Sequence, residues 1–260
     1  MNTTIVAGQN LKYTGERIIP GKTVDLIFRE HEERYVFAGQ YVSDKDVLDV
    51  ACGTGVGTSF LKGAGARDVK GIDIDPDAIA FAKAAYEDCE FAQGDATALC
   101  LSDSSVDVVV SFETIEHVTD QHGFLLECCR VLRPGGVLIC STPNRRIFRW
   151  LADNPFHVRE LFPMEFRDLV GSIFPTVELF GQSNQVYPLY IVRTTAGEAL
   201  DRLRLKSTLK RILRGAPDAN EFRTRFVNNT GALRGSVTPY CSNFLMQPAF
   251  LIAVARKAAV

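Results

Sequence analysis

The stretch VLDVACGTGVGTSFLKGAGARDVKGIDI, residues 47–74, decides the fold. It begins with the mostly apolar run Val47–Val50, which predicts a buried strand. A glycine loop at residues 53–57 follows, then a short helix over about 58–63, then a second apolar run, Val69–Ile74, that carries Asp73. Because parallel strands need a crossover between them, this order predicts the first unit of a parallel α/β sheet.

The composition of the glycine loop indicates what kind of ligand it would accept. Glycines let the backbone approach a ligand closely, and the following helix offers free N–H groups at its N-terminus. Asp73, at the end of the second strand, can accept hydrogen bonds from two ribose hydroxyls. The spacing is G-x-G-x-G, whereas dinucleotide sites usually show G-x-G-x-x-G. Asp49 precedes the loop, where its carboxylate would repel a pyrophosphate and attract an ammonium group. The pattern therefore disfavours an NAD(P) oxidoreductase.

Several motifs of the first 144 residues carry a family resemblance. They are D-V-A-C-G-T-G-x-G with G-I-D-I, G-D-A at 94–96 and L-R-P-G-G-x-L at 132–138. Together they closely resemble class I S-adenosylmethionine (SAM) methyltransferases, over roughly residues 47–144. The resemblance implies an α/β, Rossmann-like, doubly wound sheet of seven strands, mostly parallel, with the last strand antiparallel.

The same resemblance implies how SAM would be held. Asp49 and the glycine loop would hold its methionine part, Asp73 its ribose and Ile74 one face of its adenine. An acid in the G-D-A position hydrogen-bonds the adenine amino group in this family. The expected SAM-binding residues are Asp49, Ala51, Gly53, Thr54, Gly55, Asp73, Ile74, Asp95, Ala96, Phe112 and Arg17.

Composition narrows the class of protein. The chain has 260 residues, enough for one domain with a sizeable core, and a net charge of −2, which argues against a generally basic nucleic-acid binder. Its seven cysteines form no C-x-x-C pair, which favours buried thiols in a reducing compartment. The N-terminus has no signal-peptide pattern, and no apolar run approaches the ~20 residues of a membrane span. We expect a cytoplasmic protein.

The regions outside the motifs predict a cap and an insert. Residues 1–42 form an N-terminal cap with helices over 24–42, and residues 43–260 form the methyltransferase domain. The segments G-E-R-x-x-P and H-x-x-R-Y-x-F-A resemble bacterial methyltransferases found with glycan biosynthesis, where such a segment covers the SAM pocket. There Arg17 would contact the SAM carboxylate; a surface pairing with Glu16 or Glu30 is the alternative.

An irregular insert of about 182–247 interrupts the last strands, which we expect at 176–180 and 250–254. Within it, residues 201–214 predict a basic amphipathic helix. Three interpretations remain open for this helix: a solvated cover, a surface for an anionic acceptor such as a nucleotide-sugar, or peripheral membrane contact. The insert could also build a homodimer contact.

A second group of polar residues follows the predicted strand 106–112. Glu113, Glu116 and His117 would share one face of a helical turn at the carboxyl edge of the sheet, where such folds bind ligands. Two carboxylates and an imidazole suit a divalent cation such as Mg²⁺, Mn²⁺ or Zn²⁺. His157 is a further histidine downstream.

The motif E-x-x-E-H with a later histidine resembles two metal-dependent groups, the ubiquinone-pathway catechol O-methyltransferases and the small-RNA 2′-O-methyltransferases. The resemblance implies a metal at Glu113, Glu116, His117 and His157 that lowers the pKa of an acceptor hydroxyl. Two alternatives remain: His117 as a general base without metal, and a structural role. The predicted catalytic residues are His117, Glu113 and His157.

These patterns favour a SAM-dependent methyltransferase acting on a small polar acceptor. We expect O-methylation of a hydroxyl or carboxyl of a sugar or glycan precursor, which could be nucleotide- or lipid-linked. A quinone precursor, a phenolic natural product or an amine are alternative acceptors. A SAM-binding regulatory subunit without chemistry is the alternative from another class.

Overall fold

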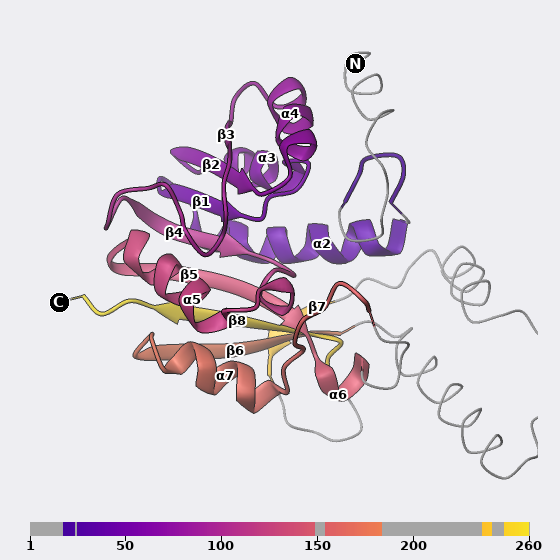
Figure 1. Cartoon of the computed structure of the whole chain (residues 1–260), viewed down its shortest axis with the longest axis vertical. Helices are drawn as coiled ribbons and strands as arrows, with labels where there is room; N and C mark the ends of the chain where they lie inside the picture. The colour runs from indigo at the N-terminus through magenta and orange to yellow at the C-terminus, as the bar shows by residue number, and fades with distance from the viewer. Residues whose placement is uncertain (1–17, 24, 149–153, 184–235, 241–246, 260) are drawn as a thin grey trace, which may run out of the picture.

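The computed structural model describes residues 18–23, 25–148, 154–183, 236–240 and 247–259 (Figure 1). These residues form one eight-stranded sheet in the order β3-β2-β1-β4-β5-β8-β6-β7. Helices cover both of its faces (Figure 1). The predicted doubly wound α/β architecture is therefore confirmed.

The first half of the sheet is parallel and follows the predicted alternation of strands and helices. Its strands are β1 (Asp46–Val50), β2 (Asp68–Asp73), β3 (Glu90–Gln93), β4 (Val106–Ser111) and β5 (Leu132–Pro143). Its helices are α3 (Val56–Gly63), α4 (Pro76–Ala85) and α5 (Gln121–Val131), with the short η2 (Ile115–His117) after β4.

The second half is antiparallel. It contains α6 (Arg145–Phe148), α7 (Pro163–Gly171), β6 (Thr176–Ser183), β7 (Ser236–Pro239) and β8 (Phe250–Arg256). Strand β8 lies between β5 and β6 and runs antiparallel to both. Strand β7 continues the sheet on the other side of β6.

The expected strand count was wrong by one, because β7 is an eighth strand within the predicted irregular insert. It is four residues long, ends in proline and pairs only with β6, so it shows no alternation long enough to be recognised. Two strands, β7 and β8, therefore run opposite to the other six. The basic stretch 201–214 lies outside the described residues.

Alternate side chains of the central strands fill two cores. Leu48 and Leu138 pack on one face with α5 and α7, whereas Val47 and Val108 pack on the other with α2 and α3. Both faces of β1 are thus buried, as its apolar sequence predicts. Helix α4 begins at Pro76, because the Asp75 carboxylate before it accepts hydrogen bonds from the N–H groups of residues 77 and 78.

Helix α2 (Asp25–Ala38), followed by η1 (Gly39–Tyr41), packs against the sheet and joins the α2–α3 core through Phe37 and Ala38. Arg34 is fully buried between α2 and the strands β6 and β8. Its Nη1 donates to Gln182 Oε1 at 2.6 Å, and its guanidinium lies 4.6 Å from the ring centre of Phe250. None of the helices in the described ranges is long and apolar enough to cross a bilayer.

Candidate active site

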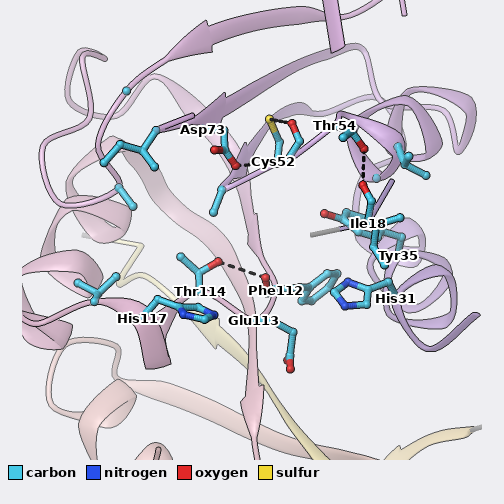
Figure 2. A pocket seen from close by; sticks show the side chains of 18 of the residues that line it. Ile18, His31, Tyr35, Cys52, Thr54, Asp73, Phe112, Glu113, Thr114 and His117 are labelled. Carbon is cyan, nitrogen blue, oxygen red and sulfur yellow. Dashed lines mark hydrogen bonds between the residues drawn. The ribbon is translucent and has the colours of Figure 1, made fainter. Parts of the chain in front are cut away.

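A cavity of about 920 Å³ opens at the carboxyl edge of the parallel strands (Figure 2). The glycine loop and the end of β2 form one side of the cavity, and the turn after β4 forms the other side. Side chains of α2 line the cavity between these two sides. The site therefore lies where the sequence predicts it, at the ends of β1, β2 and β4.

The glycine loop forms the floor of this cavity with a strained backbone. Ala51 has a φ of 61°, Gly53 of 54° and Gly55 of 80°. A Cβ at Gly57 would overlap the ring of Tyr35, which α2 places directly over the loop. The glycines thus serve two purposes, since Gly53 and Gly55 allow left-handed turns and Gly57 makes room for α2.

Asp73 stands at the wall of the cavity and is fixed by backbone donors. Its Oδ2 accepts from the Gly53 N–H at 2.8 Å, and its Oδ1 accepts from the Asp75 N–H at 2.9 Å. Ile74 beside it lines the same cavity and is 67% exposed, so its apolar side chain is open to a ligand. A fixed carboxylate with an apolar neighbour suits a ribose and its base.

Asp49 takes a different position from the one expected. It is fully buried behind the cavity wall, where it accepts hydrogen bonds from Thr58 Oγ1 at 2.7 Å and from the Tyr35 hydroxyl at 3.2 Å. Burial raises the pKa of Asp49 to about 7; the two hydrogen bonds oppose this rise and the charge of Asp73 adds to it. Asp49 therefore supports the loop and α2 from behind.

The remaining predicted SAM-binding residues either line the cavity, lie behind its wall or fall outside the described residues. Asp95 lies on the wall, and its hydrogen bonds from the Thr97 N–H and hydroxyl hold its pKa below the ordinary value. Gly55 lies behind the wall and Arg17 lies outside the described residues. The predicted residues that line the cavity are Ala51, Gly53, Thr54, Asp73, Ile74, Asp95, Ala96 and Phe112.

The turn after β4 separates two glutamates that the sequence placed on one face. Glu113 has a φ of 51° and lines the cavity, where its Oε1 accepts from Ser141 Oγ at 2.6 Å. Glu116 is fully buried; its Oε2 accepts from Thr142 Oγ1 at 3.1 Å, and its Oε1 has no hydrogen-bond partner within the described ranges. Burial, with the nearby charge of Glu113, raises the pKa of Glu116 well above its ordinary range.

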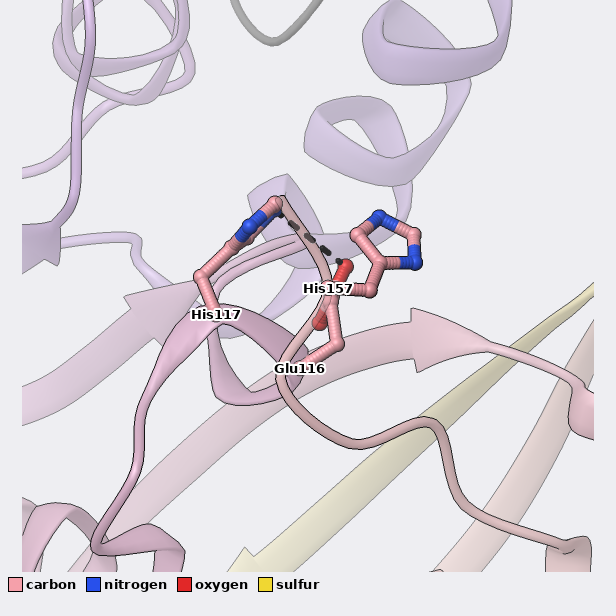
Figure 3. Close-up of side chains that lie close together, drawn as sticks. All are labelled: Glu116, His117 and His157. Atoms are coloured by element: carbon pink, nitrogen blue, oxygen red, sulfur yellow. Dashed lines mark ion pairs between the residues drawn. The ribbon is translucent and has the colours of Figure 1, made fainter. Parts of the chain in front are cut away.

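Three of the four predicted metal ligands lie together (Figure 3). Glu116, His117 and His157 can each offer one ligand atom such that all three lie within 4.8 Å of one another. Glu113 is not part of this group. The shared face expected for Glu113 with Glu116 and His117 does not form, because the positive φ at Glu113 turns the chain and only residues 115–117 are helical.

Hydrogen bonds from other residues orient both histidines of this group. His117 Nδ1 lies 3.0 Å from the Phe156 carbonyl oxygen, and its Nε2 lies 4.0 Å from Glu116 Oε1. His157 Nδ1 lies 2.8 Å from Glu160 Oε1, and its Nε2 lies 3.0 Å from Asn154 Nδ2. Carbonyl and carboxylate partners on Nδ1 favour Nδ1–H tautomers, which leave Nε2 as the acceptor nitrogen.

Sequence reasoning missed the part of the wall that α2 supplies. Phe28, His31 and Tyr35 line the cavity from this helix, and Phe156 lines it beside His117. The spacing of residues 28, 31 and 35 is that of one helix face. The sequence therefore held a signal that these three side chains point the same way.

The strand order, the glycine loop and the acid at the end of β2 define the fold of class I SAM-dependent methyltransferases. Sequence comparison agrees, since the family model described as a methyltransferase domain matches residues 48–140. The comparisons thus support a class I SAM-dependent methyltransferase domain over this part of the chain, and SAM is the cosubstrate of that class.

Curated relatives are similar over the same region. A probable S-adenosylmethionine-dependent methyltransferase of Mycolicibacterium smegmatis is 44% identical over 164 residues, 62% of this chain and 63% of the relative. A probable S-adenosylmethionine-dependent methyltransferase of Mycobacterium tuberculosis is 42% identical, with 62% and 60% covered. This chain thus spans less than two thirds of either relative. A ubiquinone biosynthesis O-methyltransferase of Cereibacter sphaeroides is 37% identical over 103 residues, 38% of this chain and 41% of that protein.

Solved structures share the fold at low sequence identity. A SAM-dependent methyltransferase from Thermotoga maritima aligns with a TM-score of 0.59 at 16% identity, and the match covers 89% of this chain and 92% of that one. At this identity the likeness concerns the fold alone.

Proposed function

We propose that this chain transfers the methyl group of SAM to a small polar acceptor in the cavity described above. One observation carries the proposal: the fixed carboxylate of Asp73 and the polar turn of Glu113 and His117 face a single cavity. A sulfonium is already an activated methyl donor. The protein therefore needs mainly to align two substrates and to receive a proton.

The donor side of the cavity suits SAM in shape and in charge. Asp73 would accept hydrogen bonds from the ribose hydroxyls, and the exposed Ile74 would cover the adenine. Asp95 and Ala96 would contact the adenine edge. Asp49 would act through Thr58 and Tyr35 by holding the loop and α2 in place.

We infer that the acceptor is a hydroxyl or carboxyl compound, with a sugar or glycan precursor as the favoured class. The E-x-x-E-H turn supports O-methylation, and partial similarity to a ubiquinone biosynthesis O-methyltransferase is consistent with it. A quinone precursor, a phenol or an amine are the alternatives. Glu113 faces the cavity beside Phe112 and would contact the acceptor directly.

A divalent cation at Glu116, His117 and His157 is a second proposal. The buried Glu116 Oε1 lacks a partner within the described ranges, and each histidine has its Nδ1 held by an oxygen, as in many metal-binding histidines. Such an ion supplies Lewis-acid chemistry that lowers the pKa of a nearby hydroxyl. Asn154 would have to release His157 Nε2 for ligation.

Binding and turnover measurements test the first proposal. Isothermal titration should show SAM binding and no binding of NAD. Transfer of tritium from methyl-labelled SAM to a panel containing a hexose, a hydroxy acid, a catechol and a primary amine should identify the acceptor class. Binding of SAM without transfer to any member would instead support a regulatory subunit, and preference for NAD would refute the proposal.

Elemental analysis of the purified protein tests the cation. Glu116→Gln should lose bound metal, whereas Glu113→Gln, which lies outside the group of three, should retain it. Absence of metal from the wild type, together with activity that EDTA does not affect, would refute a cation at this site.

A further inference from the structure

Helix α2 presents a histidine to the cavity from the side opposite the His117 turn. His31 is half-buried and lines the same cavity as Phe112 and Glu113, and Figure 2 shows it among the side chains on the wall. The acceptor would react at this place, because the turn after β4 forms its side of the cavity. His31 therefore belongs to the wall that an acceptor would touch.

Most ionisable side chains of the same wall are already engaged. The carboxylates of Asp73 and Asp95 accept hydrogen bonds from backbone N–H groups, and Glu113 accepts from Ser141. The Tyr35 hydroxyl donates to Asp49. The polar atoms of these groups already make hydrogen bonds within the protein.

His117, the histidine that the sequence favoured for proton removal, is also engaged. Its Nδ1 contacts the Phe156 carbonyl, and its Nε2 faces the buried Glu116. His31 differs, because neither of its ring nitrogens is hydrogen-bonded within the described ranges.

The surroundings of His31 keep it in its neutral form. Burial, and then the positive charge of Arg34 on the same helix, lower the pKa of His31 well below 6.5. The same cavity wall also carries Glu32 on α2 and Glu113 on the turn after β4. A neutral imidazole offers one nitrogen lone pair, which is what a proton acceptor near pH 7 requires.

We propose that His31 is a catalytic residue that accepts the proton of the acceptor hydroxyl; this rests on the proposed methyltransferase function. In the step, an oxygen lone pair forms the bond to the methyl carbon of SAM while the carbon–sulfur bond breaks and its electron pair goes to sulfur. The hydroxyl proton moves to the unprotonated ring nitrogen of His31. The positive charge lost by the sulfonium thus appears on the imidazolium, which later releases its proton to water.

The test compares His31→Asn with His117→Asn and with His122→Asn, an exposed control on α5. With the panel member that the wild type methylates best, His31→Asn should lower kcat about 100-fold while the Kd of SAM and the melting temperature stay near wild type. The control should match the wild type throughout. Loss of activity in His117→Asn with full activity in His31→Asn would overturn the assignment.

A second measurement does not depend on the acceptor. An NMR titration of the imidazole C2 proton, assigned with His31→Asn and made with S-adenosylhomocysteine bound, should give a midpoint below 6.5 for His31. A midpoint above about 8 would overturn the proposal even if methyl transfer is established, because the imidazole would then already carry its proton at pH 7. Methyl transfer to no panel member, with SAM bound, would refute the proposed function and this role with it.

Discussion

The two sides of the cavity are built differently. The donor side comes from one continuous stretch, β1 to the residues after β3, and its key carboxylate, Asp73, is fixed by backbone N–H groups. The acceptor side joins side chains from α2, the turn after β4 and residues 154–160. Two groups buried behind it, Glu116 and Arg34, keep nitrogen or oxygen atoms without partners in the described part of the chain.

This difference indicates how each side is specified. Backbone donors hold Asp73 in place whether or not a ligand is present. Unpaired buried polar atoms destabilise a folded protein, and the one on Glu116 is the observation behind the cation proposed above. The donor side is thus held by its own backbone, whereas the acceptor side is held by side chains from several segments.

The largest expected effect would break the donor side. In Gly57→Val the new side chain would overlap Tyr35 and push α2 away from the loop. We expect a loss of about 3 kcal/mol or more in the free energy of unfolding and no detectable SAM binding. Adding Tyr35→Ala should restore part of the free energy of unfolding, measured by chemical denaturation, and part of the SAM binding, measured by titration. A stable, SAM-binding Gly57→Val protein would contradict the described packing.

The next effect concerns Asp49 and depends on pH. Its pKa is about 7 in the folded protein against an ordinary 3.8, so the folded state keeps a proton that the unfolded state loses as the pH rises from about 4 to 7. Stability from this group is therefore present below pH 4 and lost by pH 7, by up to roughly 4 kcal/mol. Asp49→Asn cannot titrate. As the pH rises from about 4 to 7, the melting temperature of Asp49→Asn should therefore rise relative to that of the wild type. A difference in melting temperature that does not change with pH would contradict a buried carboxyl that keeps its proton in the folded state.

A smaller effect is expected from Asp73→Ala. Loss of the carboxylate that we propose binds the ribose should raise the Kd of SAM tenfold or more, about 1.4 kcal/mol, in isothermal titration. Asp120→Asn, at an exposed helix cap on the cavity rim, is a matched control that should leave the Kd unchanged. An unchanged Kd in Asp73→Ala would mean that the ribose is held elsewhere.

The smallest effect should come from the acceptor side. Arg34→Met removes a buried charge whose Nε and Nη2 have no partners within the described ranges and keeps an apolar chain of similar length. Replacing poorly satisfied buried charges with apolar groups is often neutral or stabilising. The melting temperature should therefore stay level or rise. A loss of several degrees would show that the contacts with Gln182 and Phe250 outweigh the unpaired donors.

The sequence predicted the donor side well because local rules determine it. Apolar runs, glycines and a strand-end acid place β1, the loop, β2 and Asp73 without knowledge of distant contacts. Asp49 lies in the predicted strand, but its burial behind the wall was not predicted. Its burial depends on Tyr35, which comes from α2.

The acceptor side was predicted only in part because it depends on long-range packing. The spacing of Glu113, Glu116 and His117 implied a common helical face, but a single positive φ at Glu113 separates the two glutamates. His117 and His157 do come together, although 40 residues separate them in sequence. His31 was overlooked because its place on the wall follows from the docking of α2.

Strand β7 has a consequence for the rest of the chain. Ser183, the last residue of β6, pairs with Ser236, the first residue of β7, so the two ends that flank residues 184–235 lie at adjacent points of the sheet. Antiparallel neighbours need only a two-residue connection. A chain in which such a turn joins Ser183 to Ser236 would therefore keep the pairing of β6 with β7.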